Sequence, residues 1–186
     1  MATYWANGTN AFMKLIMALQ SASGDDFGFK DTWGIDNTFY FACYIENSNG
    51  DAWNYHEDGI GSIVNGNALT VDTQMFNFAA QLFGDADLAA IRASQIAKGK
   101  EATIFDILFY PVDGVTEAPE LKLDYYMEGI DAFVSRDSWE NGALYVGIMG
   151  GLNGYSPYGA ESATLNPVWS LKPIVIFSLF IIYIST

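Results

Sequence analysis

Apolar residues in the first part of the chain recur at the spacing of an amphipathic helix. The clearest example runs from Asn10 to Ser21, where the pattern predicts a helix capped by Thr9 or Asn10 and ended at Gly24. Asp85 is a predicted cap and Gly99 a predicted terminator of another helix. The same spacing predicts helices over residues 38–45, 73–83, 85–98 and 101–109, the last of them stopped by Pro111.

After Pro119 the pattern changes from helical spacing to alternation. Two alternating runs, residues 133–136 and 144–148, flank Asn141-Gly142, a pair that favours the positive φ angles of a tight hairpin turn. The sequence therefore predicts an antiparallel hairpin over residues 131–149. The expected fold class is α+β, with a helical domain over residues 1–128 and an antiparallel β domain over 129–186.

The C-terminal segment contains an apolar run over residues 174–184. Its length falls short of the roughly 18 to 20 residues that span a bilayer. Because it is rich in Ile, Val and Phe, it is typical of a buried strand. A membrane anchor over Val168–Ile184 is the alternative, but Lys172 and Pro173 interrupt that segment.

Residues 47–67 form the longest stretch without periodicity. This stretch is rich in Gly, Asn and Asp, which predicts a long loop. Long loops inside compact domains are often functional. The loop is therefore the first place to look for chemistry.

Charge and cysteine content exclude several classes of function. The net charge is −14 and no Lys/Arg cluster is present, which argues against nucleic-acid binding and fits poorly with a strongly anionic ligand such as a sulfated glycan. The single cysteine, Cys43, excludes an internal disulfide and a cysteine-based metal site, and its apolar surroundings predict a buried thiol. Aromatic residues make up 16% of the 186 residues, which suits either a Phe-rich core or stacking on sugars.

Three segments carry a likeness to one family. They are "DAWNYHEDG" at residues 51–59, "FVSRDSWENGALYVGIMGGLNGYS" at residues 133–156, and Tyr4-Trp5 followed by Gly8. In order and spacing the chain resembles the heparinase II/III-like polysaccharide lyases over roughly residues 4 to 165. The segment at residues 133–156 is the most specific part of this likeness.

The resemblance implies an (α/α) toroid followed by a β-sandwich, with a substrate cleft between them. On this basis the chain would contain part of the toroid and the first antiparallel strands of the sandwich. The loop over residues 47–67 would then lie beside the bend at residues 150–156. The implied reaction is β-elimination on uronic-acid polysaccharides, which requires a neutralised carboxylate, a base and an acid.

The resemblance also implies individual roles. Tyr4 matches a tyrosine that acts as acid or base, although an aromatic packed at a helix start explains it equally well. Arg136 lies where the family binds its anionic substrate, with a solvated strand residue as the alternative. His56 falls at a variable position of the family's loop, and Asp58 is equally well explained as a turn former. The substrate-binding positions implied together are Trp5, Asn54, Tyr55, Arg136, Trp139 and Asn153.

The chain departs from the family where histidines are expected. The family continues Ser-His-Gly-His-x-Asp, whereas Pro157 and Gly159 occupy the histidine positions here and only Glu161 keeps a carboxylate. Proline has neither a donor nor a base, so it does not replace histidine. The family's upstream Asn-His pair would precede residue 1. The sequence therefore predicts a truncated or frame-shifted piece of a lyase that is inactive as given, with no cofactor and no metal.

The expected partner is an acidic polysaccharide or oligosaccharide. A rival interpretation is a carbohydrate-binding pseudo-enzyme that stacks sugars on Trp5, Trp53, Tyr55 and Trp139. Family members are often secreted or periplasmic, but the opening MATYWANGTN has neither the basic nor the apolar region of a signal peptide. The compartment, the sugar and the linkage stay open at this point.

Overall fold

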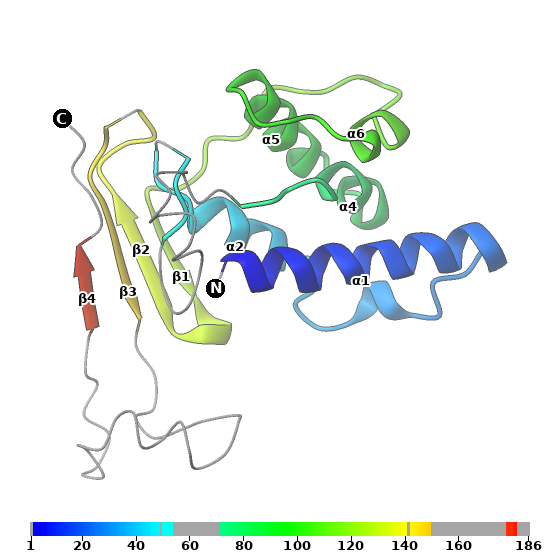
Figure 1. Cartoon of the computed structure of the whole chain (residues 1–186), viewed down its shortest axis with the longest axis horizontal. Helices are drawn as coiled ribbons and strands as arrows, with labels where there is room; N and C mark the ends of the chain where they lie inside the picture. Colours follow the sequence, from blue (N-terminus) through cyan, green and yellow to red (C-terminus); the bar gives the residue numbers. More distant parts are fainter. Residues whose placement is uncertain (1, 49, 54–70, 141, 150–177, 182–186) are drawn as a thin grey trace, which may run out of the picture. The chain divides into compact units, whose positions relative to one another are not determined.

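The fold is mixed α+β, with helices in the first part of the chain and an antiparallel sheet in the second (Figure 1). The computed structural model describes residues 2–48, 50–53, 71–140, 142–149 and 178–181. Contacts divide the chain into two compact units, Met1–Leu121 and Lys122–Thr186. The first unit holds the described helices named α, and the second holds the strands.

Helix α1 (Ala2–Ser23) is longer than the sequence pattern predicts. It begins at Ala2, so the predicted cap at Thr9 or Asn10 is wrong and both residues lie inside the helix. Ala2 and Ala6 are buried on the same face as Met13, and this packing outweighs the low helix propensity of the intervening Gly8. The predicted end is correct, because Gly24 takes a φ of 75° and donates its N–H to the carbonyl of Gln20 at 2.9 Å.

The remaining helices confirm the pattern with shifted ends. They are α2 (Thr38–Tyr44), α4 (Phe76–Phe83), α5 (Ala86–Ala97) and α6 (Ile104–Leu108), preceded by the 3₁₀ turn η1 (Phe29–Asp31). Helix α6 starts later than expected because Thr103 and Asp106 form a capping box there. Aromatic packing joins α2 to α4 through Phe39 and Phe76, whose ring centroids lie 5.3 Å apart. Cys43 is buried in α2, as predicted.

Asp85 caps α5, as predicted, and joins it to α2. Its Oδ1 accepts the N–H of Asp87 at 3.0 Å, and its Oδ2 accepts the hydroxyl of Tyr40 at 2.9 Å. We expect Asp85→Ala to lower the free energy of unfolding by about 2 kcal/mol, because a cap and a tertiary hydrogen bond are both lost. Urea denaturation measures this. Asp87→Ala, in the exposed first turn, should cost less than about 1 kcal/mol; equal losses for the two variants would contradict the assignment.

The sheet is antiparallel in the order β1-β2-β3-β4 (Figure 1). Its strands are β1 (Asp124–Met127), β2 (Ala132–Arg136), β3 (Tyr145–Met149) and β4 (Ser178–Ile181), with the 3₁₀ turn η2 (Glu128–Ile130) between the first two. Strand β4 lies within the apolar run that predicted a strand. The sequence pattern contained no signal for β1, which belongs to the second unit although residues up to 128 were assigned to the helical domain.

The predicted hairpin between β2 and β3 is confirmed. Arg136 pairs with Tyr145 at the end of the ladder next to the turn, and Ala143 donates its N–H to the carbonyl of Glu140 at 3.1 Å. Gly142 has a φ of 80°, which a side chain would disfavour. The connection is longer than a two-residue turn, since the ladder stops at Arg136 and Tyr145. Asn141 lies outside the described residues.

One face of β2 and β3 is buried. Ala132, Val134 and Arg136 point to that face together with Tyr145, whereas Phe133 is 36% exposed on the other. The alternation seen in the sequence therefore reflects a half-buried sheet. It also places Arg136 on the buried face, so the alternative of a solvated strand arginine is wrong.

Among the described residues, none of the helices combines the length and apolar character needed to cross a bilayer.

Candidate functional site

The two residues predicted near the start of α1 have different surroundings. Tyr4 is 66% exposed, so its phenol is open to solvent rather than packed as a core aromatic. Trp5 contacts α2 instead. Its indole N–H donates to Oγ1 of Thr38 at 2.7 Å, and its ring meets the Phe39 ring edge-on at 6.2 Å. Tyr4 thus lies on the exposed side of α1, whereas Trp5 joins α1 to α2.

The loop that followed α2 in the prediction is described only at its start. Trp53 is 4% exposed, so its ring faces are covered and do not offer a platform for a sugar. Its backbone N–H donates to the carbonyl of Ile45 at 2.6 Å. The expected contact between the loop at 47–67 and the bend at 150–156 lies outside the described residues, as do Asn54, Tyr55, His56, Asp58, Asn153, Pro157, Gly159 and Glu161.

Arg136 and Trp139 are two of the predicted substrate-binding residues, and the structure brings them together. The guanidinium carbon of Arg136 lies 3.6 Å from the centroid of the Trp139 ring and 4.9 Å from that of Tyr145. Arg136 is 4% exposed and Tyr145 is 1% exposed. Burial raises the pKa of the Tyr145 hydroxyl, with a smaller opposing effect from Arg136, so this phenol is neutral near physiological pH.

This arrangement fixes the guanidinium plane. Cation–π contact uses the faces of the guanidinium and of the rings, while a guanidinium binds carboxylates through its edge. The two rings therefore restrict the guanidinium of Arg136, which is itself largely covered at 4% exposure. Tyr145 completes the cluster, and the sequence interpretation did not single it out. Its register opposite Arg136 in a half-buried hairpin was the available signal.

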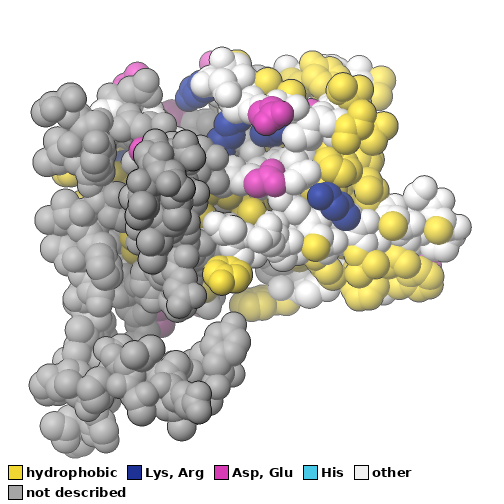
Figure 2. All heavy atoms as spheres, viewed as in Figure 1, with side chains coloured by type: hydrophobic (Ala, Val, Ile, Leu, Met, Phe, Trp, Pro, Cys, Tyr) yellow, Lys and Arg dark blue, Asp and Glu magenta, His cyan; other side chains and the backbone are white. Residues whose placement is uncertain are grey.

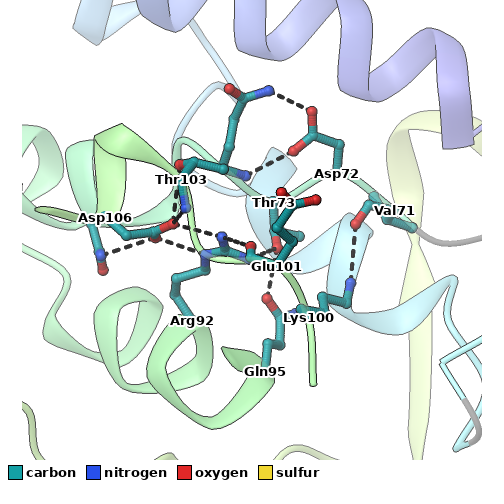
Figure 3. A network of polar contacts seen from close by, with 11 residues as sticks. Val71, Asp72, Thr73, Arg92, Gln95, Lys100, Glu101, Thr103 and Asp106 are labelled. Carbon is teal, nitrogen blue, oxygen red and sulfur yellow. Dashed lines mark hydrogen bonds and ion pairs between the residues drawn. The ribbon is translucent and has the colours of Figure 1, made fainter. Parts of the chain in front are cut away.

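The largest polar cluster of the helical unit was also missed by the sequence interpretation (Figure 3). Arg92 makes a two-pronged contact with Asp106, from Nε to Oδ1 at 2.8 Å and from Nη2 to Oδ2 at 2.7 Å. It also donates to Oγ1 of Thr73 at 3.0 Å and to the carbonyl of Glu101 at 2.8 Å. The available signal for this cluster in the sequence was Arg92, a charged residue on the apolar face of the helix predicted over residues 85–98.

Asp106 is the acceptor at the centre of this cluster. Burial acts to raise its pKa, but hydrogen bonds from Arg92 and Thr103 outweigh burial, and the pKa lies below its usual value. Asn77 donates to the same carboxylate at 3.2 Å. The Arg92 network (Thr73, Arg92, Glu101, Thr103 and Asp106) therefore ties α5 and α6 to the segment before α4. Its groups bind one another, which makes it a structural element rather than a reaction centre.

A second buried ion pair joins Glu46 to Lys100. Glu46 also contacts Val71, which directly follows residues 54–70. Oε1 of Glu46 accepts Nζ of Lys100 at 2.6 Å and the N–H of Val71 at 2.7 Å. Lys100 also donates to the carbonyl of Val71 at 3.0 Å (Figure 3). Burial raises the pKa of Glu46 even though Lys100 acts to lower it. This Glu46–Lys100 clasp joins the segment after α2, the segment before α4 and the segment after α5.

In the described part of the chain, no group of three or more His, Cys, Asp and Glu side chains is arranged to hold a metal ion. Comparison of the chain with protein-family models, with curated proteins and with solved structures finds no match.

Proposed function

We propose that the chain is a heparinase II/III-like polypeptide that binds a uronic-acid oligosaccharide and does not cleave it. In this proposal the helices correspond to part of an (α/α) toroid, and the sheet corresponds to the first strands of a β-sandwich. The observation that supports it is the contact between Arg136 and Trp139. These are two of the positions at which the resemblance expects substrate.

The chemistry of this pair suits a carboxylate-bearing sugar. The arginine supplies planar donors for the uronate, and an aromatic ring beside it suits the apolar face of a pyranose. The net charge of −14 disfavours the most strongly anionic polysaccharides among the possible ligands. A polymer that carries carboxylates but no sulfates is repelled less than a sulfated one, so unsulfated uronides such as alginate or hyaluronan fragments are the proposed ligands.

The expected lack of turnover follows from catalytic groups that the resemblance expects and the sequence does not supply. Elimination needs charge neutralisation together with a positioned base and acid, and each contributes orders of magnitude in rate. Tyr4 supplies at most one proton-transfer group. Pro157 and Gly159 stand where the resemblance expects histidines, and neither side chain transfers a proton.

We expect Arg136→Lys to weaken binding of unsulfated oligouronides about tenfold, since a lysine keeps the charge but loses the planar fork. Isothermal titration calorimetry measures this. Lys98→Gln removes an exposed positive charge from the other unit and should leave affinity within about twofold. Circular dichroism checks that each variant is folded. Unchanged affinity in folded Arg136→Lys, or no binding by the unmodified chain, would reject the proposal.

The same samples should form no unsaturated uronide, which absorbs in the ultraviolet, on alginate, heparan or hyaluronan. Pro157→His alone should stay inactive, because one imidazole does not restore both proton transfer and charge neutralisation. Product that forms with the unmodified chain and disappears in Tyr4→Phe would instead show an active lyase.

A further inference from the structure

The segment between α1 and α2 displays aromatic rings to solvent. Trp33 is 91% exposed, Phe27 is 62% exposed and Phe29 is 38% exposed. Figure 2 shows apolar side chains gathered along α1 and the segment beside it. A tryptophan exposed to this degree is unusual on a soluble surface, because its large apolar area gains from being covered.

These rings are presented by an ordered backbone. Oδ1 of Asp25 accepts the N–H of Phe27 at 2.8 Å, and Oδ1 of Asp26 accepts the N–H of Gly28 at 2.9 Å. Phe29 contacts Phe12 of α1 edge-on, with ring centroids 5.8 Å apart. Phe27 has a φ of 55°, which is costly for a bulky side chain. The turns therefore hold Phe27 and Trp33 outward at a cost in local conformation.

The same segment is strongly acidic. Residues 25–36 contain Asp25, Asp26, Asp31 and Asp36 against the single base Lys30, so four acids minus one base give a charge of −3. Lys30 approaches Asp26 at 3.9 Å, which leaves the exposed carboxylates of the other three acids as the outer charge of the segment.

We propose that residues 25–36, the aromatic–acidic loop, dock a segment of another protein that is rich in Lys or Arg. Cationic side chains bind both to the faces of aromatic rings and to carboxylates, so one such segment satisfies both features of the loop. A second copy of this chain is disfavoured, because each copy has a charge of −14. An anionic glycan or membrane surface is repelled for the same reason.

The exposure of the rings also defines the shape of the partner. A cage for a small organic cation would bury the faces of its aromatic rings, whereas Phe27 and Trp33 are mostly exposed. Rings spread along a loop suit an extended peptide that contacts them in turn. This surface shares no residue with the proposed sugar site and selects the opposite ligand charge, so the two proposals stand or fall separately.

The test uses the full chain and a fluorescein-labelled peptide of alternating arginine and leucine, with a glutamate–leucine peptide for comparison. Fluorescence polarisation at low salt gives the affinity. We expect Trp33→Ala to weaken binding of the basic peptide about fivefold, and Trp33→Phe to restore most of it. Phe27→Gly should also weaken binding while leaving the thermal midpoint equal or higher, because it relieves the positive φ.

A matched pair of variants separates this surface from the general negative charge of the chain. Asp31→Asn/Asp36→Asn and Asp113→Asn/Glu117→Gln remove the same charge from exposed positions. The first should weaken binding several-fold and the second less than about twofold. Equal effects of the two pairs, an unchanged affinity in Trp33→Ala, or equal binding of the glutamate peptide would overturn the proposal. A dimer in analytical ultracentrifugation that Trp33→Ala dissolves would assign the loop to self-association instead.

Discussion

Replacing Asp106 with asparagine is expected to lower the free energy of unfolding by about 3 kcal/mol. The substitution keeps the shape of the side chain but removes the charge that faces Arg92. That guanidinium is 2% exposed and lies 2.7 Å from the carboxylate, so it stays buried without its counter-charge. Removing one member of a buried pair costs more than the pair contributes, because the remaining charge has lost its hydration.

Urea denaturation of the two proteins measures this loss, and Asp26→Asn is the matched control. Asp26 makes the same kind of ion pair, but with Lys30, whose side chain is 46% exposed, at 3.9 Å. Solvent screens such a pair, so the control should cost no more than about 1 kcal/mol. The double variant Arg92→Met/Asp106→Leu should recover part of the stability, since no buried charge remains. Equal losses for Asp106→Asn and Asp26→Asn would contradict this account.

The pH dependence of the Asp106→Asn deficit has a definite sign. The folded-state pKa of Asp106 is lower than its ordinary value of 3.8. A carboxyl with a depressed pKa stabilises the fold above its unfolded pKa, and this stabilisation is lost as the pH falls through the folded value. The deficit should therefore be full near neutral pH and should shrink below about pH 3.8.

The second large effect concerns the Glu46–Lys100 clasp. Lys100→Met should lower the free energy of unfolding by about 3 kcal/mol, because it leaves a buried carboxylate without its cation. Glu46 is 7% exposed. Of its two contacts in the clasp, the Lys100→Met variant keeps only the hydrogen bond from the N–H of Val71. Glu46→Gln should cost about 1 kcal/mol, because the amide oxygen still accepts from Lys100 and Val71, and Lys100, with 18% of its side chain exposed, keeps part of its hydration. A larger loss in Glu46→Gln than in Lys100→Met would reverse this assignment.

Acidification distinguishes the two clasp variants. Burial raises the pKa of Glu46 above its ordinary value of 4.5, so the folded state binds this proton more tightly than the unfolded chain does. A raised folded pKa gives stability that is present below the unfolded pKa and is lost as the pH rises through the folded value. The deficit of Lys100→Met should hence shrink as the pH falls from neutral, because Glu46 takes up a proton at a higher pH than an ordinary glutamate does. The stability deficit of Glu46→Gln should not shrink in this pH range, because glutamine does not take up a proton. Chemical denaturation at several pH values provides the measurement.

Local sequence patterns were sufficient to predict whether most segments form a helix or a strand. Helices α2, α4, α5 and α6 and the β2–β3 hairpin follow from spacing, from the cap at Asp85 and from the turn around Gly142. Each of these signals acts over a few neighbouring residues, so it is present in the sequence itself. The start of α1 was not predicted, because burial of Ala2 and Ala6 against distant residues overrides the weak propensity of Gly8.

The order of helices before strands and the acidic charge can be read from the sequence alone. Which polar residues are buried and paired became clear only from the three-dimensional packing. Arg92 meets Asp106, and Glu46 meets Lys100 at a separation of 54 positions along the chain. It also decided that Trp53 is covered while Trp33 is open to solvent. Burial depends on contacts between segments far apart in sequence, and no local pattern encodes those contacts.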